Sequence, residues 1–269
     1  MRKRRKVFMA KKDVLLEKNG EIATIIFNRP EKRNALTHEM WKEIPGLVED
    51  VENDRNIKVL VVRGADHTSF AAGADISEFK TLRADSAGAK IYNDATHKAE
   101  RAIATMKKPS IAMIQSWCIG GGCEIALACD LRFTDTNGRF GITPANLGLV
   151  YSLTATKQLV DLVGPSQAKY ILLSGKHLDV DHALRIGLVD QVFSPEEIVE
   201  ETYKFAEGLC KKAQFTVRSM KEIIGFILQG QTEDNEYTEQ LRNGSFDTED
   251  YHEGVQAFLE KRKPQFTFS

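Results

Sequence analysis

The sequence predicts an α/β fold followed by a helical C-terminal region, and three observations lead to that expectation. Short apolar runs alternate with stretches of helical spacing as far as about residue 194, an order typical of α/β proteins. From Pro195 onward the pattern is almost wholly helical. The chain has 269 residues, 42% of them hydrophobic, which is enough for one sizeable core. We therefore expect a basic N-terminal arm at residues 1–12, a core at 13–194 and a helical region at 195–269.

The core is expected to begin with a β-hairpin and a helix. The apolar residues 14–16 and 22–27 are separated by Asn19-Gly20, and an Asn-Gly pair readily adopts the positive φ angles of a tight turn. Thr37 then occupies a helix N-cap position, because apolar residues at helical spacing follow it from Met40 to Val51.

Strands and helices continue to alternate after this first helix. Each expected strand is a short apolar run, whereas each expected helix repeats its apolar residues every three or four positions. In chain order we expect a strand at 59–62, a helix at about 92–106, a strand at 110–115, a helix at 123–128, a strand at 130–134, and a helix at 153–174 that is broken at Gly164-Pro165.

The charge balance indicates no general affinity for nucleic acid or for an anionic membrane. Lys and Arg number 37 against 38 Asp and Glu, so the net charge is −1. The first twelve residues are an exception, since seven of them are basic. No apolar run reaches the roughly 18 residues of a membrane span, and no signal peptide is recognisable. We expect a cytoplasmic protein without a membrane or nucleic-acid partner.

Neither the cysteines nor the histidines indicate a metal site. The four cysteines include no C-x-x-C pair and are too few for a disulfide scaffold in a chain of this length. The six histidines are scattered, without the spacing of a zinc-binding motif. We expect reduced thiols and no metal.

Two loops of small residues are the first candidates for a functional site. Ala71-Ala72-Gly73-Ala74 and Gly120-Gly121-Gly122 each follow an expected strand and precede an expected helix. Without bulky side chains, their backbone N–H groups can approach an anionic oxygen, and a helix N-terminus adds its dipole. Neither loop matches a nucleotide-phosphate motif. The alternative is that the glycines only allow close packing.

Glu124 follows the triple glycine directly, in the first turn of the expected helix. The helix dipole favours a carboxylate at this position, so the presence of a glutamate here does not require a catalytic role. It would also be well placed as a general acid or base beside the backbone amides. The residue pattern alone leaves both interpretations open.

At these residues the chain resembles the crotonase superfamily, which includes enoyl-CoA hydratases and isomerases. The resemblance spans nearly the whole chain and rests on four segments in order. They are Asn28-Arg29-Pro30-Glu31-Lys32-Arg33-Asn34-Ala35-Leu36, Phe70-Ala71-Ala72-Gly73-Ala74-Asp75-Ile76, Gly120-Gly121-Gly122-Cys123-Glu124, and residues 178–192 around Ala183-Leu184-x-x-Gly187-Leu188-Val189.

The resemblance implies a crotonase-like ββα superhelical spiral in which the C-terminal helical region, residues 195–269, mediates oligomerisation as a trimer or a dimer of trimers. It also implies an acyl-CoA substrate, with no cofactor beyond the coenzyme A that the substrate carries. The amides of Ala74 and Gly121 would form an oxyanion hole for the thioester carbonyl. The residues implied along the coenzyme A are Ala72, Gly73, Asp75 and Ile76, and Lys261 resembles a C-terminal lysine that reaches coenzyme A phosphates.

One departure bears on the reaction. Hydratases of this superfamily usually carry a second glutamate, in a Phe-Gly-x-Pro-Glu segment, and the two carboxylates together position a water. Here the segment reads Phe140-Gly141-Ile142-Thr143-Pro144, so Pro144 stands in the place of the second glutamate. Because proline cannot move a proton, Glu124 would have to hydrate alone.

The substituted segment is similar to that of bacterial methylmalonyl-CoA decarboxylases. The similarity lies in Thr143-Pro144-x-Asn146-Leu147-Gly148-x-x-Tyr151 and in residues 247–266. It implies that Thr143 lies along the substrate and that Tyr151 hydrogen-bonds the departing carboxylate, although these decarboxylases carry histidine where this chain has Ala74. This similarity favours an acyl-CoA lyase that decarboxylates a malonyl-type CoA thioester such as methylmalonyl-CoA.

Two alternatives remain. The first is an enoyl-CoA hydratase or double-bond isomerase that uses Glu124 as its only acid and base, which Ala74 favours. The second is a non-catalytic or RNA-binding homologue, to which the basic arm would contribute. Substitution of Glu124 by glutamine should abolish hydration, whereas a base-free decarboxylation should depend more on Tyr151.

Overall fold

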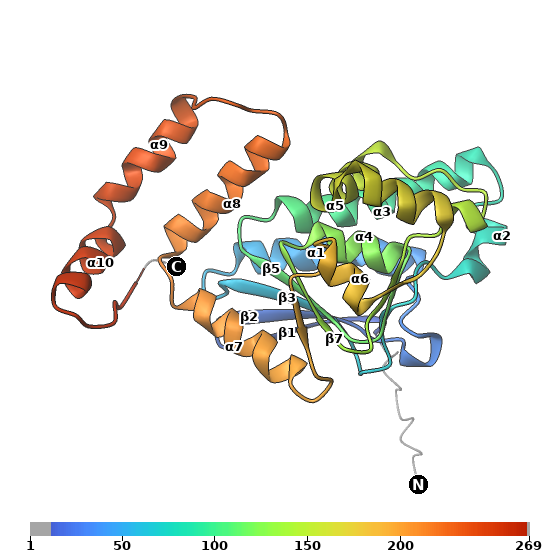
Figure 1. The fold of residues 1–269 in the computed structure, drawn as a ribbon, viewed down its shortest axis with the longest axis horizontal. Helices are drawn as coiled ribbons and strands as arrows, with labels where there is room; N and C mark the ends of the chain where they lie inside the picture. The colour runs from blue at the N-terminus through green and yellow to red at the C-terminus, as the bar shows by residue number, and fades with distance from the viewer. Residues whose placement is uncertain (1–11, 268–269) are drawn as a thin grey trace, which may run out of the picture.

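The computed structural model describes residues 12–267 and has the expected α/β architecture (Figure 1). Its larger sheet contains, in spatial order, β1 (Val14–Asn19), β2 (Ile22–Phe27), β3 (Val59–Gly64), β5 (Ser110–Ile114), β7 (Leu131–Asp135) and β10 (Gln191–Phe193). β1 and β2 form the expected antiparallel hairpin, and all other neighbouring pairs are parallel. The two-residue turn of the hairpin is Gly20-Glu21 and not the expected Asn19-Gly20, because Asn19 still pairs with Ile22 and the positive φ angle, 58°, is that of Gly20.

A second, smaller sheet is built from short strands. In spatial order it contains β4 (Ser69–Ala71), β6 (Trp117–Ile119), β8 (Arg139–Gly141) and β9 (Leu178–Asp179). The strands β4, β6 and β8 directly follow β3, β5 and β7 in the chain and are parallel to one another. Successive segments thus contribute one strand to each sheet, and helices follow the strand pairs. This repetition brings the loops after β4 and β6 side by side.

Helices surround the two sheets and extend beyond them. They are α1 (His38–Asn53), α2 (Phe79–Leu82), α3 (Ser86–Thr105), α4 (Gly121–Ala128), α5 (Leu153–Ser174), α6 (Val180–Arg185), α7 (Ile198–Cys210), α8 (Gln214–Leu228), α9 (Glu236–Gly244) and α10 (Glu249–Leu259). Short 3-10 turns occur at Pro30–Lys32, Ile76–Glu78, Pro144–Asn146 and Ser245–Asp247.

The core has one layer on each face of the larger sheet. In β3 alternate side chains point to opposite faces: Leu60 and Val62 belong to the layer beneath α1, α3 and α4, whereas Val59 and Val61 pack with α7. A strand buried on both faces has to be apolar throughout, and this explains the continuous run at 59–62.

Local signals account for the helix boundaries. Thr37 caps α1, its hydroxyl oxygen accepting a hydrogen bond from the Met40 N–H at 3.2 Å, as expected. α5 is broken at Gly164, where φ is 77°. α3 begins at Ser86, earlier than residue 92, because Asp85 caps it by accepting from the Gly88 N–H at 2.8 Å. The apolar pattern misses this start because the first turns of α3 are largely exposed.

The helices of the expected C-terminal region pack in two different ways. α7 lies against the larger sheet, with Ile198 and Ala206 fully buried. α8, α9 and α10 extend away from the two sheets (Figure 1). Within residues 12–267 no helix is both long and apolar enough to cross a membrane. Most of the basic arm expected at residues 1–12 lies outside the described residues.

Candidate active site

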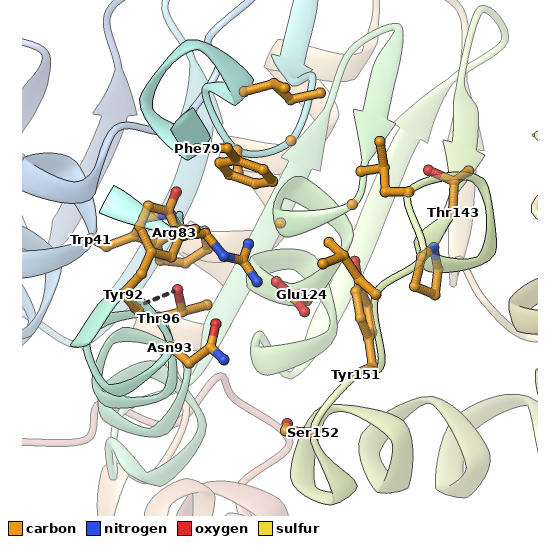
Figure 2. A pocket seen from close by; sticks show the side chains of 18 of the residues that line it. Trp41, Phe79, Arg83, Tyr92, Asn93, Thr96, Glu124, Thr143, Tyr151 and Ser152 are labelled. Carbon is orange, nitrogen blue, oxygen red and sulfur yellow. Dashed lines mark hydrogen bonds between the residues drawn. The ribbon is translucent and has the colours of Figure 1, made fainter. Parts of the chain in front are cut away.

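A cavity of about 270 Å³ opens between α3, the loops after β4 and β6, and residues 143–152 (Figure 2). Most residues that the sequence singled out line this cavity: Ala72, Gly73, Ala74, Ile76, Gly121, Glu124, Thr143 and Tyr151. Asp75 and Lys261 do not line it. The side chains of Arg83 and Glu100, which the sequence analysis did not single out, also contribute to its wall.

The segment around Arg29 holds the first small-residue loop in place. The Arg29 guanidinium donates hydrogen bonds to the Asp75 carboxylate at 3.0 Å, and the Asn34 amide donates to the Ser69 carbonyl at 2.7 Å. Hydrogen bonding from Ser77, followed by that from Arg29, lowers the pKa of Asp75. Asp75, expected along coenzyme A, is therefore engaged in an ion pair that fixes the loop.

The two small-residue loops meet and leave two amides free. Gly73 and Gly120 adopt φ angles of 99° and 52°, and a Cβ atom on Gly73 would lie 3.9 Å from the Cα of Gly120. Within the described part of the chain, the N–H groups of Ala74 and Gly121 have no hydrogen-bond acceptor, although both residues line the cavity. Gly121 is also the first residue of α4, where the helix dipole favours an anion. The arrangement can bind a developing oxyanion.

Glu124 lies beside these amides. Its Oε2 atom is 3.6 Å from the position that a Cβ atom on Gly121 would occupy. Burial raises the pKa of Glu124 from 4.5 to about 7, and the positive charge of Arg83 partly offsets this rise. A carboxyl group with a pKa near neutrality can both accept and release a proton, as a general acid or base must.

Arg83 supplies the positive charge in the cavity. Its guanidinium carbon lies 4.5 Å from the ring centre of Phe79 and 5.0 Å from that of Tyr92, a cation–π arrangement. Figure 2 shows the guanidinium directed toward Glu124. No residue that the structure describes forms an ion pair with Arg83. Its charge therefore acts on the cavity.

Tyr151 and Thr143 stand on the opposite wall from α3 (Figure 2). The Tyr151 hydroxyl would be 3.8 Å from a Cβ atom on Gly120, so it lies over the glycine loop. Burial, and secondly the negative charge of Glu124, raises the pKa of Tyr151, which keeps it a neutral hydrogen-bond donor. Asn146 is exposed and donates to the Gly175 carbonyl at 3.2 Å, so it supports this wall from outside the cavity.

Glu100 is the acidic residue that the sequence analysis missed. It lies on α3, is only 3% exposed, and lines the cavity together with Glu124. Burial, and secondly the charge of Glu124, raises the pKa of Glu100 from 4.5 to about 9. Tyr92, Thr96 and Glu100 recur every four residues, which places three polar groups on one helix face. This four-residue spacing of polar side chains is the sequence signal that could have identified Glu100 as a candidate site residue.

Lys261 follows α10, with a φ angle of 55°. It belongs to the helical C-terminal region and does not contribute to the cavity of its own chain. Cavity residues thus come from the core, whereas the lysine that the resemblance singled out comes from outside it.

Comparison with known proteins places this geometry in a family. A sequence model described as "Enoyl-CoA hydratase/isomerase" matches residues 17–268. The chain is 37% identical over 259 residues to the crotonyl-CoA hydratase of Syntrophomonas wolfei, covering 96% of this chain and 99% of the relative. It is 34% identical over 252 residues to the short-chain-enoyl-CoA hydratase of Clostridium acetobutylicum, covering 93% and 96%.

Solved structures agree with the sequence comparison. An enoyl-CoA hydratase/isomerase family protein from Hyphomonas neptunium superposes with a TM-score of 0.93 at 37% identity, covering 96% of this chain and 98% of that one. Pseudomonas aeruginosa DspI superposes with a TM-score of 0.88 at 31% identity, covering 98% and 100%. The matches cover nearly the whole of each chain, and this chain therefore belongs to the enoyl-CoA hydratase/isomerase family, within the crotonase superfamily.

Proposed function

We propose that this protein is an acyl-CoA enzyme that adds water to the double bond of a 2-enoyl-CoA thioester. The observation that carries the proposal is the Glu124 carboxyl group, of near-neutral pKa, in one cavity with the free amides of Ala74 and Gly121. The names of the two hydratase relatives support it. Coenzyme A enters as part of the substrate, and the reaction needs no redox group.

In the proposed reaction the thioester oxygen accepts hydrogen bonds from the Ala74 and Gly121 N–H groups. Glu124 takes a proton from water as the water oxygen bonds to C3. The π electrons of the double bond move onto the thioester oxygen. The resulting enolate then takes a proton at C2 from a carboxylic acid of the cavity, and the substrate has gained one water. Each well-placed oxyanion donor is commonly worth about 2.7–4 kcal/mol of barrier. Ala72, Gly73 and Ile76 would lie along the pantetheine arm.

Double-bond isomerisation is a variant of the same chemistry. There a single carboxylate, Glu124, moves a proton between C2 and C4 while the same two amides hold the enolate. It uses no attacking water.

Parallel incubation with crotonyl-CoA and methylmalonyl-CoA, with the products resolved by mass, tests the proposal. We expect crotonyl-CoA to gain one water and methylmalonyl-CoA to persist. If propionyl-CoA forms and crotonyl-CoA gains no water, the proposed hydration is wrong and decarboxylation, the reaction first expected from the sequence, is favoured.

Decarboxylation is the second candidate because Thr143 and Tyr151 line the cavity with the free amides. The C–C bond to the carboxylate would break, carbon dioxide would leave, and the bonding electrons would pass to an enolate held by Ala74 and Gly121. Tyr151→Phe would then lower the rate more than Glu124→Gln. The relatives named above carry hydratase names, so we rank this candidate below hydration.

We also propose that the protein self-associates through its C-terminal helices, as a trimer or a dimer of trimers. Large apolar side chains on α8 and α10 are exposed in the single chain: Met220, Ile224, Ile227, Phe258 and Leu259. Surface of this kind is typical of subunit interfaces. Within such an assembly Lys261 would have access to coenzyme A bound at a neighbouring subunit.

The charge of Arg83 offers a test of Glu124 as the base. Arg83 lowers the pKa of Glu124, so Arg83→Met is expected to raise that pKa. Because the base must be ionised, the acidic limb of the kcat/KM profile for crotonyl-CoA should move to higher pH. If the acidic limb moves to lower pH or does not move, ionisation of Glu124 is not the cause of that limb.

A further inference from the structure

The position taken by Pro144 leaves the family's usual second carboxylate missing, yet the cavity contains two carboxyl groups. Glu124 stands on α4 and Glu100 on α3, and these two helices pack against each other. Both side chains line the same cavity. The second carboxyl group therefore comes from a different element, one that precedes the glycine loop in the chain.

The surroundings of Glu100 do not explain it as a structural residue. It is 3% exposed, on the buried face of α3 that also carries Ala99 and Ile103. Among residues 12–267 no donor forms a hydrogen bond or an ion pair with its carboxyl group. The Glu100 carboxyl group faces the cavity, where burial disfavours its charged form, so its presence there calls for a reason other than packing.

The other titratable side chains of the cavity are Arg83, Tyr92, His97, Glu124 and Tyr151. Of these groups, Glu124 is the one whose charge acts on the titration of Glu100. Two carboxyl groups in one poorly solvated cavity cannot both be ionised without a large cost, so one of them keeps a proton. Glu100 is the group that keeps the proton, because it is 3% exposed whereas Glu124 is only partly buried, and because the positive charge of Arg83 favours the ionised form of Glu124.

We propose that Glu100 is the second catalytic carboxyl group of this enzyme. It would act as the proton donor while Glu124 acts as the base, and would replace the glutamate whose place Pro144 takes. This inference rests on the proposed hydration. Glu124 takes one proton from water as the water oxygen bonds to C3, and Glu100 gives its proton to C2 as the enolate collapses. The substrate has then gained one water, Glu124 is protonated and Glu100 ionised. Transfer of one proton from Glu124 to Glu100 restores the starting state.

The first test is the pH dependence of crotonyl-CoA hydration. In the wild-type protein the rate should rise as Glu124 ionises near pH 7 and fall as Glu100 ionises near pH 9. Glu100→Gln should lower kcat by about 10²-fold or more, the range for loss of a general acid, and should remove the basic limb. Glu100→Asp should recover part of the rate and retain a basic limb. Glu43→Gln, an exposed change on α1, is the matched control and should leave rate and profile unchanged.

The second test needs no activity. The pKa of Glu100 is raised in the folded state, so the folded protein holds a proton that the unfolded chain has released. Stability should therefore fall as pH rises from about 4.5 to about 9. In Glu100→Gln the unfolding temperature should decline less steeply over this interval, and at pH 8 to 9 it should exceed that of the wild type.

The outcomes separate the two proposals. If the wild type does not hydrate crotonyl-CoA but the unfolding temperatures behave as described, the proposed function fails while the protonated state of Glu100 stands. If hydration is found and Glu100→Gln keeps the wild-type kcat and basic limb, the inference is overturned and hydration by Glu124 alone remains. Parallel unfolding profiles for the two proteins would also overturn it.

Discussion

Glu124→Gln is expected to lower kcat/KM for crotonyl-CoA hydration by about 10²- to 10⁴-fold, the contribution typical of a general acid or base. Glutamine matches the shape of glutamate but cannot take the proton from water. The measurement is steady-state hydration at a pH above 7, where Glu124 is largely ionised in the wild type.

Protein stability provides the control for this variant. Burial raises the pKa of Glu124 from 4.5 to about 7, so ionisation of Glu124 costs stability as pH rises through this interval. The glutamine variant lacks that cost, and its unfolding temperature above pH 7 should equal or exceed that of the wild type. Wild-type activity in this variant would exclude Glu124 as the base.

Gly122→Ala is expected to reduce both activity and stability. A Cβ atom on Gly122 would lie 2.4 Å from the Ala71 carbonyl oxygen and 2.9 Å from the Ala71 Cβ. Since the carbonyl belongs to the backbone of β4, α4 and the loop after β4 would have to separate. The Ala74 and Gly121 amides would then no longer converge on one oxygen. We expect a loss of about 10²- to 10³-fold in kcat and about 1–3 kcal/mol in the free energy of unfolding.

Gly208→Ala is the matched control for this prediction. Gly208 lies within α7, and among residues 12–267 no atom outside its chain neighbours and its own helix backbone is within 4 Å of the position its Cβ would take. The alanine should stabilise the protein by about 0.4–1 kcal/mol, because it restricts the unfolded chain, and should leave kcat unchanged. Equal activities for the two alanine variants would contradict the assigned role of the loop contact.

Features governed by neighbouring residues were predictable from the sequence. The hairpin turn, the cap at Thr37 and the break at Gly164 each depend on the conformational preference of one or two residues, although the turn lies at Gly20-Glu21, one residue later than expected. The alternation of strands and helices also follows from local periodicity. These signals were sufficient for the α/β class and for the larger sheet as far as β7, but not for the short strands β4, β6, β8 and β9 of the smaller sheet.

Features that depend on packing between distant segments were not predictable in this way. Asp75 lies in a motif that the resemblance assigned to coenzyme A, but its carboxylate pairs with Arg29, which lies 46 residues earlier in the chain. Glu100 sits on a helix face whose spacing is visible in the sequence, but only the packing of α3 beside α4 brings that face to Glu124. A motif comparison shows that Pro144 stands where the second glutamate is expected, but it cannot show that a carboxyl group from another helix lies in the same cavity.

The contact between Gly73 and Gly120 has a consequence for how the protein becomes active during folding. The two glycines belong to separate strand–loop segments, so the contact forms only after the long stretch of chain between them has closed. Helix α3, with 20 residues, can form from local interactions before that closure, but the Ala74 and Gly121 amides cannot converge until it is complete. Recovered turnover during refolding thus reports on this late long-range docking, whereas the helical circular dichroism signal reports on the earlier local steps.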